Sequence, residues 1–516
     1  MLSSLAATIE APCAEGPARR DGYERRRPET TDLYKVVAEH WPAFRDRADE
    51  QGGLPRFVEK EFEEYLSCGI LERGLARLLC GLCGQEMVVA YSCKRRGFCP
   101  SCIGRRMSDV AAHLVDEILP EVPLRHWICS LPWRLRCAVG FDRHLCADVL
   151  GAFSSALERS LRRRAKKAFG LRSVEQAITG AVTFIQRGDS ALRLNPHFHT
   201  IALDGVYVRG EDGELRFHPL DPPSWEDVAQ VAAWTYEKLT RVLVHHGRSL
   251  EGLDELPDAL ASEHPVLASC YGASAGDVQL LGEKPGERVD RLTSPVLLTP
   301  TISDALAEVG GVNVHAKVSV DGRDRERVES LCRYLARPPV AQDRLSIEPE
   351  GMVRYDFKAA WKDGTRAVRL HPLDFLARLA ALVPPPRFHM VRYQGCFGAR
   401  SKVRAEVVRG GAGSTKEPVQ LALLPDECED KADPGATTHQ PTRPARSSRH
   451  PWAYLLRRVF SVDVETCSRC GGRMKLVEIA NDRHDIARVL ALHGLGPDPP
   501  VEVDPMPVGQ MPLAFA

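Results

Sequence analysis

The chain has 516 residues, with 69 basic and 69 acidic side chains, so its formal net charge is zero. A hydrophobic content of 44% and a charged content of 27% are ordinary for a folded protein of several domains. No stretch approaches about 18 uncharged apolar residues, and the N-terminus lacks the basic start and apolar run of a secretory signal. We therefore expect a cytoplasmic protein with no membrane partner, in which any binding of nucleic acid depends on local clusters of charge.

The N-terminal part of the chain divides into three segments. Residues 1–30 are rich in Ala, Pro and Arg and are predicted to be disordered. Residues 31–67 carry side chains at helical spacing, which predicts two helices. The repeating side chains are Leu33, Val36, Val37 and His40 in the first helix and Phe57, Phe62, Tyr65 and Leu66 in the second. Residues 68–106 form a cysteine-rich module.

Four of the six cysteines in this module have the spacing of a zinc site. Cys80-x2-Cys83 is followed by fifteen residues and then by Cys99-x2-Cys102. Each CxxC turn presents two thiolates to a common point, so two turns complete a tetrahedral shell around Zn²⁺. A closed shell leaves no open coordination position, which makes this zinc structural. Sixteen cysteines without an export signal also favour metal ligation over disulfides.

The module contains two further cysteines, Cys68 and Cys93, which are alternative ligands, part of a second site, or buried thiols. Basic side chains flank the cysteines, as expected for a surface that contacts the phosphate backbone of DNA. They are Lys94, Arg95, Arg96, Arg105 and Arg106. A second basic run, LRRRAKK at 161–167, has the same character, although a solvated helix face explains either run equally well.

The middle of the chain begins with a mixture of helices and strands. Residues 108–170 are predicted to be helical, except that the side chains near 127–137 alternate as in a strand with a proline break. Residues 180–210 predict a β-hairpin made of AVTFIQ and HFHTIALDGVYV, joined by a polar loop.

The rest of the chain contains one predicted insertion and one predicted linker. Residues 247–310 are rich in Gly, Ser and Glu and predict a flexible insertion, after which residues 312–320 read as a strand. Residues 351–400 resume short strands with one helix. Residues 410–450 have the composition of a disordered linker, and residues 451–516 would form a small C-terminal unit with a tail.

This C-terminal unit contains Cys467-x2-Cys470-Gly-Gly, which resembles one half of a zinc knuckle. No second CxxC pair lies near it in the sequence. His484 and His493 are the local candidates for further ligands, and another subunit is an alternative source.

The triplet His197-Phe198-His199 falls on the second strand of the predicted hairpin. Residues i and i+2 of a strand point to the same face, so both imidazoles would project together while Phe198 turns into the core. Such a pair can bind a divalent ion and leave positions open for a phosphate oxygen, although isolated HxH pairs are also common as hydrogen-bonded histidines. Gln186 on the neighbouring strand is a candidate third ligand, and weaker candidates are Asn195 and His315.

A helix predicted from Asp324 to the residues before Pro338 carries Tyr334 near its end. Its apolar stripe is formed by Val328, Leu331, Cys332 and Leu335. Tyr334 falls off the edge of that stripe, between core and solvent, where a nucleophile would be held and yet be reachable. Arg333 and Arg337 could bind phosphate beside it. A tyrosine that merely packs and hydrogen-bonds its hydroxyl is the alternative.

In combination, these motifs resemble the rolling-circle transposases of the insertion sequence 91 family, which are His-hydrophobic-His (HUH) endonucleases. The resemblance follows the family's order over residues 30–480. The matching stretches are CGILERGLARLLCGLCG, YSCKRRGFCPSCIGRRM, GAVTFIQRGDSALRLNPHFHTIALDGVYV, LCRYLARPPVAQDRLS, WKDGTRAVRLHPLDFLARLAALVPPPR and LLRRVFSVDVETCSRCGG.

The resemblance implies an α+β fold, in which a small Cys-rich zinc module precedes an HUH-type antiparallel sheet with flanking helices. It implies a DNA-binding domain at 31–107 and a nuclease domain at 108–409. It carries His197 and His199 over as metal ligands and Tyr334 as the nucleophile. Some members have a second tyrosine where this chain has Pro338, so the chain would be a one-tyrosine version that needs a second subunit or a second round.

The expected enzyme nicks and rejoins single-stranded or hairpin DNA at transposon ends through a 5′-phosphotyrosine, with Mg²⁺ or Mn²⁺ at the histidines and Zn²⁺ at the cysteines. The chain has no GxxxxGK[ST] phosphate loop, which fits a reaction that needs no ATP. Two alternatives remain open from the sequence. One is a plasmid-type replication initiator or relaxase with the same chemistry, and the other is a non-catalytic zinc-dependent DNA-binding protein.

Overall fold

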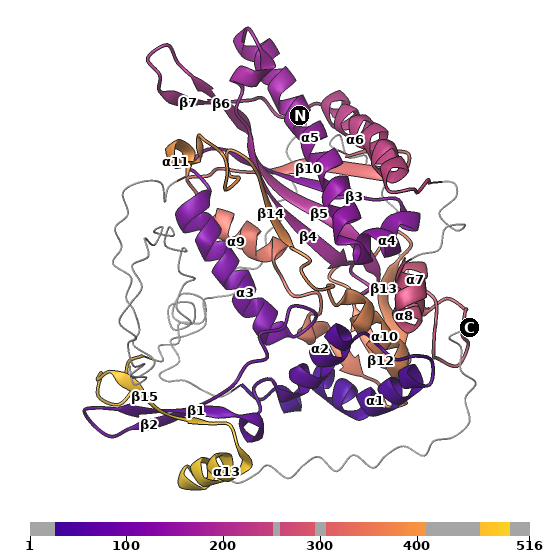
Figure 1. Ribbon diagram of the computed structural model, residues 1–516, viewed down its shortest axis with the longest axis vertical. Coiled ribbons are helices and arrows are strands. Elements are labelled where there is room, and N and C mark those ends of the chain that lie inside the picture. Colours follow the sequence, from indigo (N-terminus) through magenta and orange to yellow (C-terminus); the bar gives the residue numbers. More distant parts are fainter. Residues whose placement is uncertain (1–25, 251–258, 295–305, 409–464, 496–516) are drawn as a thin grey trace, which may run out of the picture. The chain divides into compact units, whose positions relative to one another are not determined.

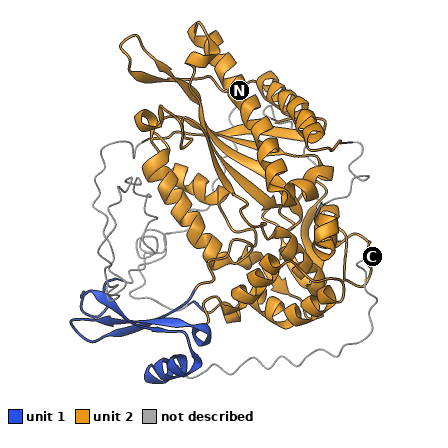
Figure 2. Cartoon of the chain, in the orientation of Figure 1, with its two compact units in different colours: residues 1–26, 71–91, 415–498 blue, residues 27–70, 92–414, 499–516 orange. Residues whose placement is uncertain are grey.

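The computed structural model describes residues 26–250, 259–294, 306–408 and 465–495 (Figure 1). These residues form two compact units (Figure 2). Within the described residues, no helix is long and apolar enough to cross a membrane.

A six-stranded antiparallel sheet runs through unit 2 in the order β14-β4-β5-β3-β10-β9 (Figure 1). Its strands are β3 (Leu124–Ser130), β4 (Gly180–Gly188), β5 (Leu194–Leu203), β9 (Leu306–Val309), β10 (Val312–Val320) and β14 (Val391–Gly395). The hairpin predicted at 180–210 is confirmed as β4 and β5, and the strand predicted at 312–320 is confirmed as β10.

Helices α5 (Arg143–Phe169) and α6 (Trp225–His245) cover one face of this sheet. The Asp142 carboxylate accepts hydrogen bonds from two backbone N–H groups in the first turn of α5, and Gly170 ends the helix with a φ of 62°. Trp127 of β3 and Phe198 of β5 are buried in the same apolar cluster as Phe153 of α5. The chain therefore buries the apolar positions of these strands under long capped helices.

The opposite face packs against α3 (Pro100–His113), the π-helical turn η3 (Leu114–Ile118) and α9 (Arg325–Leu335). Ile201 of β5 shares an apolar cluster with Val328 and Cys332 of α9. Helices on both faces of an antiparallel sheet confirm the predicted α+β class.

A buried ion pair links strands β3 and β10 to Asp204, the residue that follows β5. The Arg125 guanidinium of β3 donates to both carboxylate oxygens of Asp204, at 2.8 and 2.7 Å, and to the Ala316 carbonyl of β10 at 3.0 Å. Both charged side chains are nearly inaccessible to solvent. Because each charge is paired and hydrogen-bonded, the pair sets the alignment of these strands without leaving a buried charge uncompensated.

A second, four-stranded sheet of unit 2 has the order β11-β12-β13-β8. Its strands are β8 (Asp290–Thr293), β11 (Leu345–Ile347), β12 (Val353–Asp356) and β13 (Thr365–Leu370), and the helices in the same apolar cluster include α7 (Ala259–Glu263), α8 (Pro265–Gly276) and α10 (Pro372–Leu382). The structure thus differs from the flexible insertion predicted at 247–310. Residues 259–294 supply two helices and a strand, because Leu267, Cys270 and Tyr271 are buried against α10. Residues 251–258 and 295–305 lie outside the described residues.

The two helices predicted at 31–67 are confirmed as α1 (Asp32–Asp49) and α2 (Arg56–Ser67). Trp41 of α1 stacks on Phe62 of α2 with ring centroids 4.4 Å apart, and Phe62 also contacts Phe98 at 4.8 Å. These aromatic contacts tie the helices to the loop before Cys99.

Shorter elements complete unit 2. They are the strands β6 (Gly205–Arg209) and β7 (Leu215–Pro219), the helices α4 (Arg136–Phe141) and α11 (Arg404–Val407), and the 3-10 turns η1 (Pro28–Thr30), η4 (Trp133–Leu135), η5 (Val174–Gln176) and η6 (Gln342–Arg344).

Unit 1 combines two segments from opposite ends of the chain. Strands β1 (Leu75–Cys80), β2 (Glu86–Ala90) and β15 (Met474–Ala480) form a sheet in the order β15-β1-β2, with the turn η2 (Leu71–Arg73) and helix α13 (Arg483–Leu492) beside it. The predicted boundary at 107 and the separate C-terminal unit from 451 do not match this arrangement, because β15 pairs with β1. The predicted disorder at 1–30 and the linker at 410–450 fall almost wholly outside the described residues.

Candidate nuclease site and cysteine clusters

The two histidines of the HxH triplet lie side by side on β5, with ring centroids 4.8 Å apart. His197 is in register with Gln186 of β4 and Ser130 of β3, so these three side chains share one face of the sheet. Phe198, between the histidines, is fully buried in the cluster under α5, as its strand position predicts. The HxH face is therefore the face that α9 covers.

Hydrogen bonds orient both imidazoles. Nδ1 of His197 donates to the backbone carbonyl of Asn195 at 2.7 Å, which leaves Nε2 unprotonated in the neutral ring. Nδ1 of His199 lies 2.9 Å from Nε2 of His126 on β3, and the two rings stack. When His199 donates in this bond, its Nε2 is also free of a proton, which is the form that binds a metal.

Burial keeps these imidazoles neutral. It lowers the pKa of His199 and of His197, and the nearby charge of Arg337 lowers both further. Burial also lowers the pKa of His126 to about 4. Neutral imidazole is the metal-binding form, so the environment of the pair suits a ligand role.

Tyr334 lies close to these histidines although it comes from a distant part of the sequence. The helix begins as predicted at Asp324, whose carboxylate accepts from a backbone N–H of the first turn at 3.0 Å, and it ends at Leu335. The Tyr334 ring stands nearly perpendicular to the ring of His199, with centroids 6.5 Å apart. Tyr334 is 42% exposed, so its ring is held beside His199 and the residue is still accessible to solvent.

Cations surround the tyrosine. The Arg337 guanidinium lies over the Tyr334 ring, 4.3 Å from its centroid, and the Lys358 ammonium lies 5.9 Å from it. Both residues are exposed, so they can reach a phosphate. Arg333 donates to Glu329 on the same helix at 2.5 Å, and its charge is therefore partly neutralised.

Gln186, the predicted third ligand, is in register with His197, and it also has a structural bond. Its Nε2 donates to the backbone carbonyl of Leu335 at 2.9 Å, which ties β4 to the end of α9 and leaves Oε1 as the potential ligand atom. The weaker candidates lie nearby: Asn195 Oδ1 is buried without a hydrogen-bond partner, and His315 is half-buried on β10. Within the described residues, the histidine pair is not part of a three-residue His, Cys, Asp or Glu cluster.

Two residues of this neighbourhood were missed by the sequence analysis, His126 and Lys358. His126 occupies a polar position of the alternating segment RHWICS, which was a detectable signal. The sequence did not show that β3 pairs with β5, and only this pairing brings His126 to His199. Lys358 follows a short strand and had no distinguishing motif.

The cysteines form two clusters, each with four thiol sulfurs within 4.8 Å of one another. Cysteine cluster 1 consists of Cys68, Cys93, Cys99 and Cys102. Its Sγ–Sγ distances include 3.7, 3.4 and 3.6 Å. Tetrahedral ligands at the usual zinc–sulfur length are about 3.8 Å apart, so these distances fit one Zn²⁺. The backbone N–H of Lys94 also donates to Cys102 Sγ at 3.2 Å, and the pKa of this thiol is lowered mainly by the neighbouring thiols.

Cysteine cluster 2 corrects the predicted four-cysteine site. Cys80 and Cys83 lie with Cys467 and Cys470, whereas Cys99 and Cys102 belong to cluster 1. The spacing of two CxxC turns does not determine which turns meet. Strand pairing decides it here, because β1 runs into Cys80 and pairs with β15, which follows Cys470.

Comparison with known protein families agrees with this arrangement. A family model described as "Transposase zinc-binding domain", for insertion sequence 91 transposases, matches residues 36–131, which contain cluster 1. A second model, described as "Putative transposase", matches residues 180–404, which contain the HxH pair and Tyr334. The chain belongs to the insertion sequence 91 family of transposases. No curated protein and no solved structure matches this transposase.

Membership of the family carries several general consequences. The transposase acts in DNA transposition, and it must bind DNA at element ends and cut and join strands. Cluster 1 lies inside the family's zinc-binding domain and supplies a thiolate set that suits structural zinc.

The basic side chains predicted to contact DNA differ in their partners and exposure in this transposase. Several have partners within the protein: Arg95 pairs with Glu64, Arg96 donates to the Phe388 carbonyl, and Arg106 donates to the Lys94 carbonyl. Arg105 is half-buried, and burial lowers its pKa. The Lys94 and Arg96 side chains are exposed, so this loop still presents positive charge at the surface.

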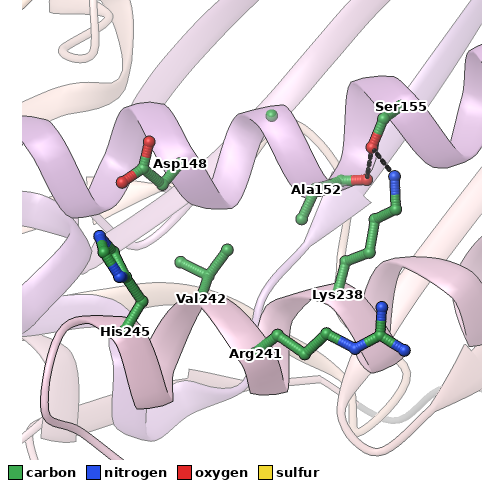
Figure 3. A pocket seen from close by; sticks show the side chains of 8 residues that line it. Asp148, Ala152, Ser155, Lys238, Arg241, Val242 and His245 are labelled. Atoms are coloured by element: carbon green, nitrogen blue, oxygen red, sulfur yellow. Dashed lines mark hydrogen bonds between the residues drawn. The ribbon is translucent and has the colours of Figure 1, made fainter.

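A groove between α5 and α6 of the transposase lies away from His197 and His199 (Figure 3). In it, the Lys238 ammonium donates to Ser155 Oγ at 2.6 Å, and Asp148 and His245 line the other end. Because α5 and α6 cover the sheet face opposite the HxH pair, this groove is separate from the candidate nuclease site.

Proposed function

We propose that this transposase nicks and rejoins single-stranded DNA at the ends of its element through a covalent 5′-phosphotyrosine on Tyr334. The observation that carries the proposal is the position of the Tyr334 ring, 6.5 Å from the ring of His199. A helix and a strand from distant parts of the chain meet at this point, and the exposed Tyr334 lies beside the neutral imidazole of His199. This is the group of side chains that an HUH endonuclease needs.

The residues fit a divalent cation at the histidine pair. His197 and His199 would hold it through Nε2, and Gln186 could add its Oε1. Mg²⁺ or Mn²⁺ bound there would polarise a phosphate oxygen and neutralise the charge that develops on it.

The chemistry of the chain's own residues begins at Tyr334. Its hydroxyl oxygen attacks the phosphorus, and the bond from phosphorus to the 3′ oxygen of the preceding nucleotide breaks. The exposed phenol releases its proton to water, and the departing 3′ oxygen takes a proton from water to become a 3′-OH. Arg337 and Lys358 carry the positive charge that holds the phosphate beside the ring.

Rejoining is the reverse step. A 3′-OH attacks the phosphotyrosine, and the phosphodiester forms again as the tyrosine leaves, so no ATP is consumed. Single-stranded or hairpin DNA suits this site because an unpaired strand can bring one phosphate to Tyr334. The exposed Lys94 and Arg96, and the remaining basic residues Arg95, Arg105, Arg106, Arg333 and Arg337, are proposed to contact the DNA backbone.

The deciding experiment incubates the purified transposase and Mn²⁺ with labelled single-stranded DNA from the element's own ends. We expect a protein–DNA adduct that resists denaturation, and Tyr334→Phe should abolish it because no nucleophile remains. Tyr236→Phe is a matched control, since Tyr236 lies on α6, over the opposite face of the sheet, and should leave the adduct intact.

The other outcomes are informative as well. Cleavage that persists in Tyr334→Phe would show that another group is the nucleophile. DNA binding without cleavage in the unmodified transposase, across end sequences and metals, would support a non-catalytic zinc-dependent DNA-binding protein instead.

A further inference from the structure

Cluster 2 brings together two CxxC turns from opposite ends of the chain within unit 1. Cys80 Sγ lies 3.5 Å from Cys470 Sγ, and Cys83 Sγ lies 3.6 Å from Cys467 Sγ. A disulfide would require about 2.05 Å, whereas tetrahedral thiolates around zinc lie about 3.8 Å apart. The sulfurs are therefore spaced for a shared metal ion rather than for a covalent bond.

The two turns have the same backbone structure. In the first turn, Cys80 N–H donates to the Gln85 carbonyl at 2.8 Å, and Gly84 N–H donates back to the Cys80 carbonyl at 3.1 Å. The second turn repeats both bonds: Cys467 N–H donates to the Gly472 carbonyl at 2.7 Å, and Gly471 N–H donates to the Cys467 carbonyl at 2.9 Å. Each loop is therefore closed in the same way around its cysteine pair.

A glycine follows the second cysteine of each turn and has a positive φ, 69° for Gly84 and 72° for Gly471. Side chains rarely adopt this conformation, so both turns need glycine at the same place. Two turns with matching bonds and matching glycines indicate two halves of one ligand set.

Close packing supports the same conclusion. A Cβ added to Gly472 would lie 3.0 Å from Cys80 Sγ and 2.8 Å from a methyl carbon of Leu82. The second turn therefore approaches the first as closely as backbone without a side chain allows.

The surrounding sheet holds the two segments together independently of the thiols. β1 pairs with β15, and Arg77 of β1 bonds both Glu478 of β15 at 3.0 Å and Glu86 of β2 at 2.7 Å. Leu75 of β1 is buried with Val489 of α13. The four cysteines therefore converge because the strands pair.

The structure assigns a second structural zinc site to Cys80, Cys83, Cys467 and Cys470. Four thiolates form a soft, closed tetrahedral shell, which selects Zn²⁺ over Mg²⁺ and leaves no open position for catalysis. The site would hold residues 465–495 against the hairpin of β1 and β2. Unit 1 would then be complete only when these residues have folded. It is independent of the proposed nuclease chemistry.

Zinc counting tests this assignment against the spacing-based alternative, in which Cys80, Cys83, Cys99 and Cys102 share one ion. The metal content of the purified full chain is measured beside serine variants. We expect two zinc ions per chain, one for each cysteine cluster. The Cys467→Ser and Cys80→Ser variants should each retain one zinc ion per chain. The variant that combines both substitutions should also retain one. Cys137→Ser, which lies outside both clusters, should retain two.

The combination of Cys80→Ser with Cys99→Ser separates the two arrangements. The assigned site predicts that this double variant loses both ions, because its cysteines belong to different clusters. If Cys467→Ser retains two ions, or if the double variant retains one, the assignment is overturned.

A conservative variant distinguishes the loss of a metal ligand from misfolding of the chain. Cys467→His keeps a metal ligand while replacing one thiolate by an imidazole, so two cobalt ions should still bind. The thiolate-to-cobalt charge-transfer absorbance should fall by one eighth, since one of the eight thiolates of the two clusters is lost. An unchanged absorbance at full cobalt loading would show that Cys467 is not a ligand.

Discussion

At the scale of single residues, His126 is the side chain that determines which ring nitrogen of His199 carries the proton. Nε2 of His126 lies 2.9 Å from Nδ1 of His199, and burial keeps the His126 ring neutral by lowering its pKa to about 4. A neutral partner that accepts at Nε2 requires the proton on Nδ1 of His199. His126 is then a positioning residue that directs the free Nε2 of His199 towards the proposed metal.

This role predicts the effect of changing His126 on metal affinity. His126→Phe removes the acceptor and should weaken binding of Mn²⁺ by about 10- to 100-fold. His126→Gln keeps a carbonyl oxygen that can accept from His199 and should recover part of the loss. Isothermal titration of Mn²⁺ into the zinc-loaded chain measures both, with circular dichroism to check folding. Equal affinity in the Phe variant and the unmodified chain would contradict the role.

At the scale of elements, the site depends on the contact between the β4–β5 hairpin and α9. Gln186 of β4 donates to the carbonyl of Leu335, the residue after Tyr334, and Cys332 of α9 is buried against the same sheet face. The carbonyls of the last helical turn have no partner within the helix, so this bond satisfies one of them. It also sets where Tyr334 stands relative to the histidines.

Helix α10 shows a comparable contact with a pH-dependent consequence. Asp374 in its first turn accepts from the backbone N–H groups of Leu280 and Leu281, both at 2.7 Å. Its second oxygen is buried without a hydrogen-bond partner. Burial raises the pKa of Asp374 above its ordinary value of 3.8, so the folded protein holds this proton more tightly than the unfolded chain.

The sign of the pH effect follows from this proton. As pH rises from 3.8 through the raised pKa, the folded state binds more protons than the unfolded state, so the free energy of unfolding contributed by Asp374 falls. Asp374→Asn keeps a side-chain oxygen that can accept hydrogen bonds, but it cannot ionise. The free energy of unfolding of this variant, relative to that of the unmodified chain, should therefore increase between pH 3.8 and the raised pKa and then level off. Urea unfolding at several pH values measures the difference. A difference that does not change with pH would contradict the prediction.

At the scale of the whole molecule, the proposed chemistry places one nucleophile, Tyr334, on α9. Tyr334 is the only tyrosine of α9, and Pro338 follows the end of the helix. Two strands therefore cannot be held at once by two tyrosines of one helix. Moving both ends of an element would require a second subunit or a second round of reaction.

This limit predicts the stoichiometry of the covalent adduct. With excess single-stranded DNA from the element ends, intact-protein mass spectrometry should show at most one DNA per chain. Tyr334→Phe should show none, and Tyr393→Phe should match the unmodified chain. A species with two DNA strands on one chain would reveal a second nucleophile.

Much of the site could be predicted from the sequence because it depends on local patterns. Alternation along β5 predicts that His197 and His199 share a face while Phe198 is buried, and the structure agrees. The Asp324 cap and the prolines at 338–339 predict the limits of α9. The zinc-binding and transposase families were likewise recognisable from motif order.

Other features depended on contacts between residues far apart in sequence. The spacing of Cys80 and Cys83 fits Cys99 and Cys102 as well as it fits Cys467 and Cys470, and the pairing of β1 with β15 decides between them. His126 meets His199 only because β3 lies beside β5, and residues 259–294 are ordered only because α8 packs on α10. The sequence by itself determined the helix and strands that carry the site, the family and the chemically active residue types, since these follow from short-range periodicity and spacing. The tertiary structure decided which ligands and partners meet, because strand pairing and burial act between segments that the sequence keeps apart.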